Sequence, residues 1–253
     1  MSHLTLATGA LEYVWVGAGL PGAATVVMMH EGLGSVSMWR DFPRRLADRI
    51  QHRVLAYSRQ GYGNSAPLAA PRLPSYMHDE ALVVLPALLK KLGIERPILF
   101  GHSDGASIAL IHAARYPARG VVALAPHVFV EELSIRNIAA ARVAYETTDL
   151  RSRLARHHAD VDGAFRGWND AWLQPAFRDW NIEAFLPDID CPVLVIQGRD
   201  DEYGTEEQLL RIEKGARTTD LLLLTDCSHS PHRDQPETVL ESVGNWMNRR
   251  GLG

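Results

Sequence analysis

The sequence predicts an α/β fold in which a mostly parallel central sheet is flanked by helices, and three observations support this prediction. Near-continuous apolar segments rich in valine, isoleucine and leucine alternate along the chain with segments of helical spacing. Strands that are buried on both faces of a parallel sheet have this uninterrupted apolar character. The length of 253 residues, with 46% hydrophobic and 22% charged residues, suits one sizeable globular domain.

The expected elements follow in a regular order. Strands are expected at 14–16, 25–30, 52–58, 97–100, 121–125, 192–197 and 220–225. Helices are expected at 38–50, 75–92, 104–116 and 236–249. Gly93 and Pro117 are suited to end the second and third of these helices.

One segment interrupts the alternation of strands and helices. From about residue 131 to residue 187 the sequence is helical and aromatic and contains no expected strand. We therefore expect an α/β core formed by residues 1–130 and 188–253, with residues 131–187 inserted as a helical cap, or lid, between two core strands.

Composition excludes several classes of function. A net charge of −4 attracts neither nucleic acid nor an anionic membrane surface. The first residues lack a cationic start followed by an apolar signal core, and no apolar run is long enough to cross a bilayer. The two cysteines, Cys191 and Cys227, cannot form a disulfide framework. We expect a cytoplasmic protein that acts on a small molecule.

The segment Gly101-His-Ser103-Asp-Gly105 lies between an expected strand and an expected helix. A chain that reverses sharply from strand to helix holds the residue at the tip in a strained backbone conformation. The two flanking glycines are needed where the backbones approach too closely for a side chain. The positive end of the following helix favours negative charge that develops at Ser103. The segment is therefore interpreted as a nucleophile elbow.

With this elbow and four further motifs, the chain resembles the α/β-hydrolase family over essentially its whole length. The resemblance implies a central sheet with a helical cap inserted after the sixth strand. It also implies acyl transfer without a cofactor or metal. The further motifs are His30-Glu-Gly-Leu-Gly through Trp39, Ser58-Arg-Gln-Gly-Tyr-Gly-Asn-Ser65, Gly198-Arg-Asp-Asp201, and Cys227-Ser-His229 followed by Pro236-Glu237.

The resemblance implies a catalytic triad. Ser103 would be the nucleophile, His229 the general base, and Asp201 the acid that orients the imidazole. Asp200 competes with Asp201 for the third role, and we favour Asp201 on family spacing. His232 competes with His229, and we expect His232 at the rim or on the surface.

The same resemblance implies an oxyanion hole built from the backbone N–H groups of Gly32 and Asp104, with Leu33 as an alternative to Gly32. Glu31 stands where relatives usually carry glycine. We expect its side chain to face outward or to pair with an arginine; the alternative is a contact with a cationic or hydroxylated group of the substrate. Trp168 and Trp172 in the cap are candidates for packing against the core, for a substrate wall, or for both.

Two apparent ligand motifs are discounted. Gly17-Ala-Gly19-Leu-Pro-Gly22 fits a dinucleotide fingerprint, but a strand rather than a helix follows it, so we expect a hairpin connection there. His157 and His158 with two nearby aspartates lack a second cluster that would complete a metal site. We therefore expect neither a cofactor nor a metal.

The sequence predicts a serine hydrolase that cleaves a small carboxylic ester, lactone or thioester through an acyl-enzyme. One alternative is the carbon–carbon hydrolysis of ring-cleavage diketones, although relatives with that activity usually carry asparagine where this chain has His102. An alternative of a different class is a ligand receptor on the same fold that does not turn over its ligand.

Overall fold

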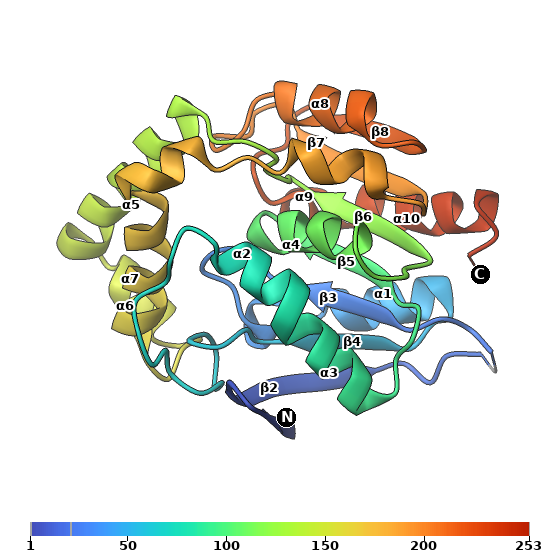
Figure 1. Cartoon of the computed structure of the whole chain (residues 1–253), viewed down its shortest axis with the longest axis horizontal. Helices are drawn as coiled ribbons and strands as arrows, with labels where there is room; N and C mark the ends of the chain where they lie inside the picture. Colours follow the sequence, from blue (N-terminus) through green and yellow to red (C-terminus); the bar gives the residue numbers. More distant parts are fainter. Residues whose placement is uncertain (1, 21, 253) are drawn as a thin grey trace.

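A computed structural model of the chain describes residues 2–20 and 22–252 (Figure 1). The strands are β1 (Ser2–Leu6), β2 (Gly9–Val16), β3 (Val26–Met29), β4 (Val54–Tyr57), β5 (Ile98–His102), β6 (Gly120–Leu124), β7 (Val193–Gly198) and β8 (Thr219–Leu224). They form one sheet in the order β1-β2-β4-β3-β5-β6-β7-β8. β1 and β2 pair antiparallel with each other and β2 pairs antiparallel with β4, whereas all remaining pairs are parallel. The predicted α/β fold with a mostly parallel sheet is confirmed.

Helices flank both faces of this sheet. The α-helices are α1 (Phe42–Ile50), α2 (Tyr76–Asp79), α3 (Leu85–Leu92), α4 (Asp104–Ala113), α5 (Glu132–Thr147), α6 (Leu150–Leu154), α7 (Val161–Trp172), α8 (Glu207–Gly215), α9 (Pro231–Asp234) and α10 (Pro236–Arg249). One π-helical segment, η2 (Glu80–Val84), joins α2 to α3. Three short 3₁₀ segments are η1 (Val36–Trp39), η3 (Pro175–Asp179) and η4 (Glu183–Asp188).

Alternate residues of the parallel strands enter two separate cores. Val27 and Met29 of β3 pack on one side together with residues of α3, α4 and α8. Val26 and Met28 pack on the other side with residues of α1 and α10. In Figure 1, α3 and α4 lie in front of the sheet, and α1 and α10 lie behind it. Strands that are apolar on both faces thus bury both faces, which explains their uninterrupted apolar sequence.

Some boundaries differ from the predictions. β1 was not expected, because its residues alternate between exposed and partly buried at the sheet edge and form no apolar run. The expected helix 38–50 is divided, since Arg40 adopts a φ of 54° between η1 and α1. The hairpin expected around residues 17–22 is wrong: β4 lies between β2 and β3, so the connection crosses over a strand. Pro21 of that motif lies outside the described residues.

The chain between β6 and β7 contains only helical segments, namely α5, α6, α7, η3 and η4. The strand-like feature described there is a single bridge between Phe129 and Asn181. α5, α6 and α7 stand together at one side of the sheet, opposite the side that carries the C terminus (Figure 1). This helical stretch between β6 and β7 is referred to below as the insertion.

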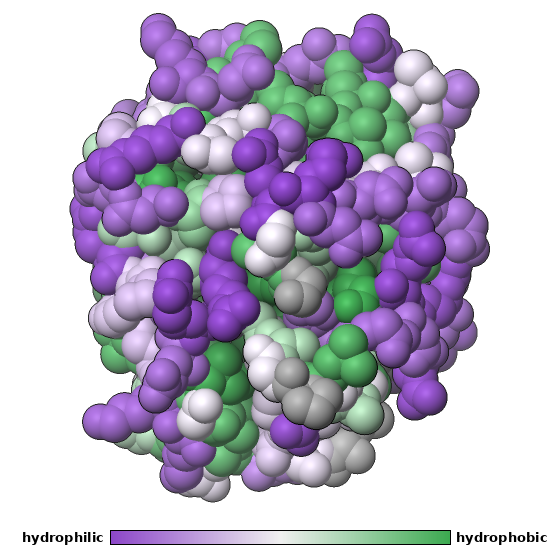
Figure 2. All heavy atoms as spheres, turned by 90° about the vertical axis from the view of Figure 1, so that its right-hand side faces the viewer, coloured by the Kyte–Doolittle hydropathy of each residue, from purple (hydrophilic) through white to green (hydrophobic). Residues whose placement is uncertain are grey.

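The face that carries the C terminus is mostly hydrophilic, and its apolar surface is divided into separate patches (Figure 2). Along residues 2–20 and 22–252, no helix has the length and apolar character needed to cross a membrane. Cys191 and Cys227 are both buried and unbridged.

Candidate active site

Ser103 occupies the turn between β5 and α4 with a φ of 53° and a ψ of −118°, a strained conformation for a residue with a side chain. The flanking glycines are required by close backbone contacts. A Cβ atom at Gly101 would lie 2.2 Å from the carbonyl oxygen of Gly105. A Cβ atom at Gly105 would lie 2.1 Å from the carbonyl oxygen of Met29. The local geometry is therefore that of the predicted elbow.

His229 and Asp201 form a hydrogen-bonded pair on the loops after β8 and β7. His229 Nδ1 donates to Asp201 Oδ1 at 2.8 Å and lies 3.0 Å from Oδ2. The backbone N–H groups of Tyr203 and Gly204 donate to the same Oδ1, at 2.8 and 3.2 Å. The structure thus brings Asp201 to the imidazole, whereas Asp200 is exposed.

This pairing changes the acidity of both partners. Burial would raise the pKa of the Asp201 carboxyl, but the charge and hydrogen bond of His229 lower it below its ordinary value. Burial opposes the charged form of His229, but the Asp201 carboxylate outweighs that effect and raises the pKa of the imidazole. An imidazole that is oriented and made more basic in this way is suited to accept a proton.

Ser103 and His229 line the same cavity of about 220 Å³. Among the hydrogen bonds of the described residues, none joins the Ser103 hydroxyl to the imidazole; such bonds are often long in ligand-free enzymes and tighten when the substrate binds. The remaining lining is mainly apolar and aromatic and includes Leu33, Met38, Ile138, Leu154, Trp168, Trp172 and Tyr203. Ile138, Leu154, Trp168 and Trp172 come from the helical insertion.

The candidate oxyanion residues lie at this cavity. Gly32 and Leu33 line it, and Asp104 is the first residue of α4, where the backbone N–H has no acceptor within the helix. The insertion contacts the loop that contains Gly32. His158 Nε2 donates to the Leu33 carbonyl at 3.0 Å, and a Cβ atom on Gly32 would lie 2.2 Å from Trp168 Nε1. Any larger residue at position 32 would therefore have to displace the indole of Trp168.

The side chain of Asp104 belongs to a buried polar network that the sequence did not reveal. Tyr76 Oη donates to Asp104 Oδ2 at 2.6 Å, and Trp172 Nε1 lies within hydrogen-bond distance of both Tyr76 Oη and Asp104 Oδ1, at 2.9 and 3.3 Å. The fully buried Arg59 guanidinium lies 3.6 Å from the same carboxylate. A cation compensates the buried anion, and the network ties α7 to the elbow.

The aromatic residues of α7 have two surroundings. Trp168 and Trp172 are buried and also line the cavity, so the core-packing and cavity-wall interpretations both describe them. Phe165 instead stacks on Tyr145, with ring centroids 3.8 Å apart. His127, which follows β6, is a cavity residue that sequence reasoning missed. Burial, reinforced by the charge of His229, lowers the pKa of His127 to about 4.

Two expectations about polar residues have different outcomes. Glu31 pairs with an arginine as expected, since Arg233 Nη2 donates to its Oε1 at 2.9 Å. The expectation of a surface position for His232 is wrong. Its ring is buried between Trp39 and Phe42, with centroids 4.7 and 5.6 Å away, because α9 folds it under the loop.

The described residues contain no group of three or more His, Cys, Asp or Glu side chains that could hold a metal ion. The two histidines of the discounted cluster have other partners. His157 Nδ1 lies 2.9 Å from Ser37 Oγ, and His158 Nδ1 accepts from the Gly63 N–H at 3.0 Å. They connect the insertion to core loops.

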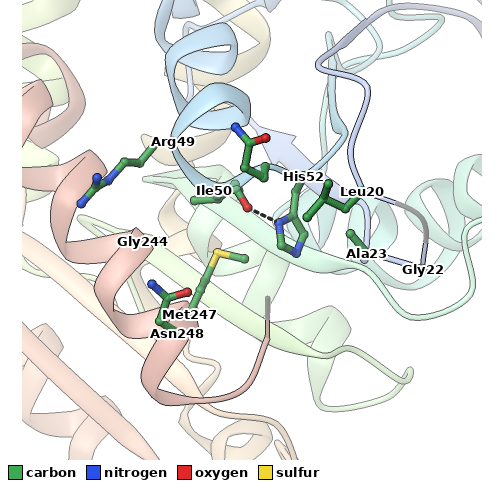
Figure 3. A pocket seen from close by; sticks show the side chains of 10 residues that line it. Leu20, Gly22, Ala23, Arg49, Ile50, His52, Gly244, Met247 and Asn248 are labelled. Carbon is green, nitrogen blue, oxygen red and sulfur yellow. Dashed lines mark hydrogen bonds between the residues drawn. The ribbon is translucent and has the colours of Figure 1, made fainter.

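A second cavity of about 510 Å³ lies between the ends of α1 and α10 (Figure 3). Part of its lining directly precedes β3 and β4 and the rest belongs to α10, so it sits at the amino ends of the parallel strands, away from Ser103. Its described lining residues include no Ser, Cys, Asp or Glu, and His52 Nδ1 donates to the Ile50 carbonyl at 2.6 Å (Figure 3). Ligand sites in open parallel sheets lie at the carboxyl ends of the strands, where the smaller cavity is found.

Comparison with known proteins agrees with the fold. The model of the alpha/beta hydrolase family matches residues 21–242. A 2-hydroxy-6-oxononadienedioate/2-hydroxy-6-oxononatrienedioate hydrolase of Pseudomonas putida is 26% identical over 239 residues, which is 82% of each chain. The sn-1-specific diacylglycerol lipase ABHD11 of Danio rerio is 23% identical and covers 90% of this chain and 80% of its own.

A solved structure gives the same result for the fold. The enol-lactonase of Burkholderia xenovorans LB400 superposes with a TM-score of 0.76 at 21% identity, covering 98% of this chain and all of its own. Because the family model matches residues 21–242, which is most of the sequence, the chain belongs to the alpha/beta hydrolase family.

Proposed function

We propose that this hydrolase is a serine hydrolase with Ser103 as nucleophile, His229 as general base and Asp201 as the residue that orients the imidazole. The observation that carries the proposal is that a strained serine and a carboxylate-bound histidine line one cavity at the carboxyl ends of the strands. A serine hydroxyl is unreactive at its ordinary pKa and needs a base of this kind.

The reaction would proceed in two halves. Ser103 Oγ attacks the carbonyl carbon while its proton passes to His229 Nε2, giving a tetrahedral oxyanion held by the backbone N–H groups of Asp104 and Gly32, or of Leu33 in place of Gly32. The imidazolium then protonates the leaving group, and an acyl-enzyme remains. Water, deprotonated by His229, attacks the acyl carbon and regenerates Ser103.

The dimensions of the cavity favour a small substrate. Its volume of about 220 Å³ is below the roughly 300–1,000 Å³ of pockets that bind drug-sized ligands. Its apolar walls suit a short acyl group rather than a long lipid chain. We therefore propose a small carboxylic ester, lactone or thioester as substrate, and a carboxylic ester hydrolase as the enzyme class.

The test is multiple turnover on short p-nitrophenyl esters, followed by a panel of lactones and thioesters. Wild-type protein is expected to turn over repeatedly, and Ser103→Ala is expected to lose about 10⁶-fold in kcat. Ser152→Ala, which alters an exposed serine of α6 outside the cavity lining, is the control and should keep activity within about threefold of wild type. Stoichiometric labelling without turnover would contradict the proposal and favour the receptor alternative.

A second candidate, carbon–carbon hydrolysis of a ring-cleavage diketone, is favoured by the name of the Pseudomonas putida relative. The same three side chains would serve it. A vinylogous diketone in the substrate panel distinguishes the two: a kcat/KM that exceeds the best ester value by tenfold or more would replace the ester proposal with this one.

A further inference from the structure

Glu31 connects three parts of the candidate site that are far apart in the sequence. It belongs to the loop after β3 and lines the cavity, and its side chain is only 15% exposed. One carboxylate oxygen faces Arg233 of α9, and the other faces His102 at the end of β5. A carboxylate buried to this degree needs partners to compensate its charge, and these two supply them.

The contacts continue from Glu31 to the loop after β8, which carries His229. His102 Nδ1 lies 3.4 Å from Glu31 Oε2, and His102 Nε2 lies 2.7 Å from the carbonyl oxygen of His229. A carbonyl only accepts, so Nε2 carries a proton and donates to it. A carboxylate also only accepts, so the contact between Nδ1 and Glu31 Oε2 requires a proton on that nitrogen too. The side chain of His102 therefore bridges Glu31 and the main chain of His229.

The main chain of His229 is thus held from both sides. Its N–H donates to Glu202 Oε2 at 3.2 Å, and its carbonyl accepts from His102. The rings of His102 and His229 also contact each other, with centroids 5.2 Å apart. The bond to Asp201 sets the rotation of the imidazole, whereas the main-chain bonds set where its Cα lies relative to Ser103.

The surroundings of His102 keep it in this orientation. Trp39 and His232 pack against its ring, with centroids 6.3 and 4.8 Å away. Burial would raise the pKa of the Glu31 carboxyl, but its close contact with His102, followed by the charge of Arg233, holds it well below its usual value. Glu31 therefore stays a carboxylate, able to accept from both neighbours.

We propose that Glu31 is a positioning residue: through His102 it fixes the main chain of His229 and so the distance between the imidazole and Ser103, while Arg233 orients the carboxylate. This inference rests on the proposed serine hydrolase function. It replaces the expectation that Glu31 only faces outward or only pairs with an arginine, and it differs from a direct contact with the substrate.

The first test separates positioning from substrate binding. Glu31→Leu, which is similar in size but has no acceptor, is expected to lower kcat by about 10²-fold with KM within threefold of wild type. Glu31→Gln can accept from Arg233 through its amide oxygen, and its amide N–H can donate to His102 Nδ1 when that nitrogen carries no proton, so it should restore kcat to within about tenfold. A tenfold rise in KM with unchanged kcat would overturn the proposal and make Glu31 a substrate contact.

The second test asks whether Glu31 acts through His102. In a double-mutant cycle, Glu31→Leu should cost less than threefold in kcat when His102→Phe is already present, because the bridge is then absent. Additive losses would overturn the proposal. Asp48→Leu removes an exposed carboxylate that pairs with Arg44 on α1, and it should leave kcat at the wild-type value.

A readout that needs no turnover separates this inference from the proposed function. The Nδ1–H proton of His229, followed by NMR in the Ser103→Ala protein, should exchange with water at least tenfold faster after Glu31→Leu and remain slow after Glu31→Gln. If wild-type protein hydrolyses nothing but this exchange responds as stated, the function fails and the positioning role stands. Unchanged exchange in folded Glu31→Leu protein would overturn the positioning role. If Glu31→Leu does not fold, Arg233→Met, which frees the other carboxylate oxygen, is measured in the same way.

Discussion

At the scale of single residues, the candidate site depends on how burial and charge tune a few titratable groups. The Asp201 carboxylate is held by two backbone N–H groups as well as by His229. It therefore cannot rotate away without leaving buried donors unpaired. The geometry favours a base with a fixed tautomer, in which Nδ1 carries the proton and Nε2 is free to accept one.

We predict that activity falls as the pH is lowered, with a midpoint above pH 6.5. The proposed base must be neutral, and Asp201 raises the pKa of His229 above its ordinary value of 6.5 despite its burial, so protonation begins at higher pH. Asp201→Asn should lower kcat by about 10⁴-fold and move the acid limb of kcat/KM to lower pH. The measurement is a pH profile from 5 to 9.

Asp200→Asn is the matched control for this prediction, because Asp200 is the exposed neighbour of Asp201. It should leave both the rate and the acid limb unchanged. If Asp200→Asn caused the larger loss, the assignment of the acid would be wrong. A kcat/KM that does not change between pH 5 and 8 would instead exclude His229 as the base.

Sequence reasoning found the residues that sit in motifs and missed those placed by tertiary contacts. Ser103 is recognisable because a tight strand-to-helix turn demands glycine on both sides within a short stretch. His127 carries no local pattern, since only folding brings it to the cavity. Arg59 sits in a motif, but only folding brings its guanidinium to Asp104. His232 was misplaced for the same reason: a polar residue type on a loop gave no sign of the aromatic surroundings into which α9 folds it.

At the scale of elements, the insertion contributes to the elbow as well as to the cavity. Trp172 of α7 reaches Tyr76 Oη and the Asp104 carboxylate, and the backbone N–H of Asp104 is a candidate oxyanion donor. The helical nature of this segment could be predicted from its residue spacing. The particular contact could not, because it depends on the angle at which α7 crosses the core.

We predict that Trp172→Phe uncouples α7 from the elbow. It keeps most of the apolar contact but removes the indole N–H, leaving polar groups of Tyr76 and Asp104 less satisfied, so it should lower the free energy of unfolding by about 1–3 kcal/mol. We also expect kcat/KM to fall by about tenfold, because the elbow is held less firmly. Chemical denaturation and ester kinetics measure the two effects.

Trp246→Phe provides a control of the same chemistry on the opposite face of the sheet. Trp246 Nε1 donates to Asp220 Oδ2 at 2.9 Å, so its loss should destabilise the fold by a similar amount. Neither Trp246 nor Asp220 lines the 220 Å³ cavity, so kcat/KM should stay unchanged. Equal kinetic losses in the two variants would show that stability alone explains the effect of Trp172→Phe.

At the scale of the whole molecule, several histidines are packed inside the fold. Burial is the largest cause that lowers the pKa of each of five of them, so that each is held neutral in the folded protein. In the unfolded chain the same groups take up protons near pH 6.5. They are His30, His112, His127, His158 and His232.

This difference predicts loss of stability in mild acid. Because the unfolded state binds more protons than the folded state between pH 6.5 and about 4, the free energy of unfolding falls as the pH falls through that window. His229 acts in the opposite direction, because its pKa is raised in the folded protein. It is a single group, so the combined effect of the five buried histidines is expected to be larger. Denaturant titrations at pH 7.5 and pH 5.0 should show a lower midpoint at pH 5.0.

His127→Phe tests the contribution of one of these groups. Phenylalanine keeps the edge-to-face contact with Trp172, whose ring centroid lies 5.1 Å away, and it cannot be protonated. With a folded pKa of about 4, His127 should account for about 2 kcal/mol of the loss at pH 5.0, so the variant should lose about that much less than wild type between the two pH values. An identical loss in both proteins would mean that carboxylates, rather than buried imidazoles, set the acid sensitivity of the fold.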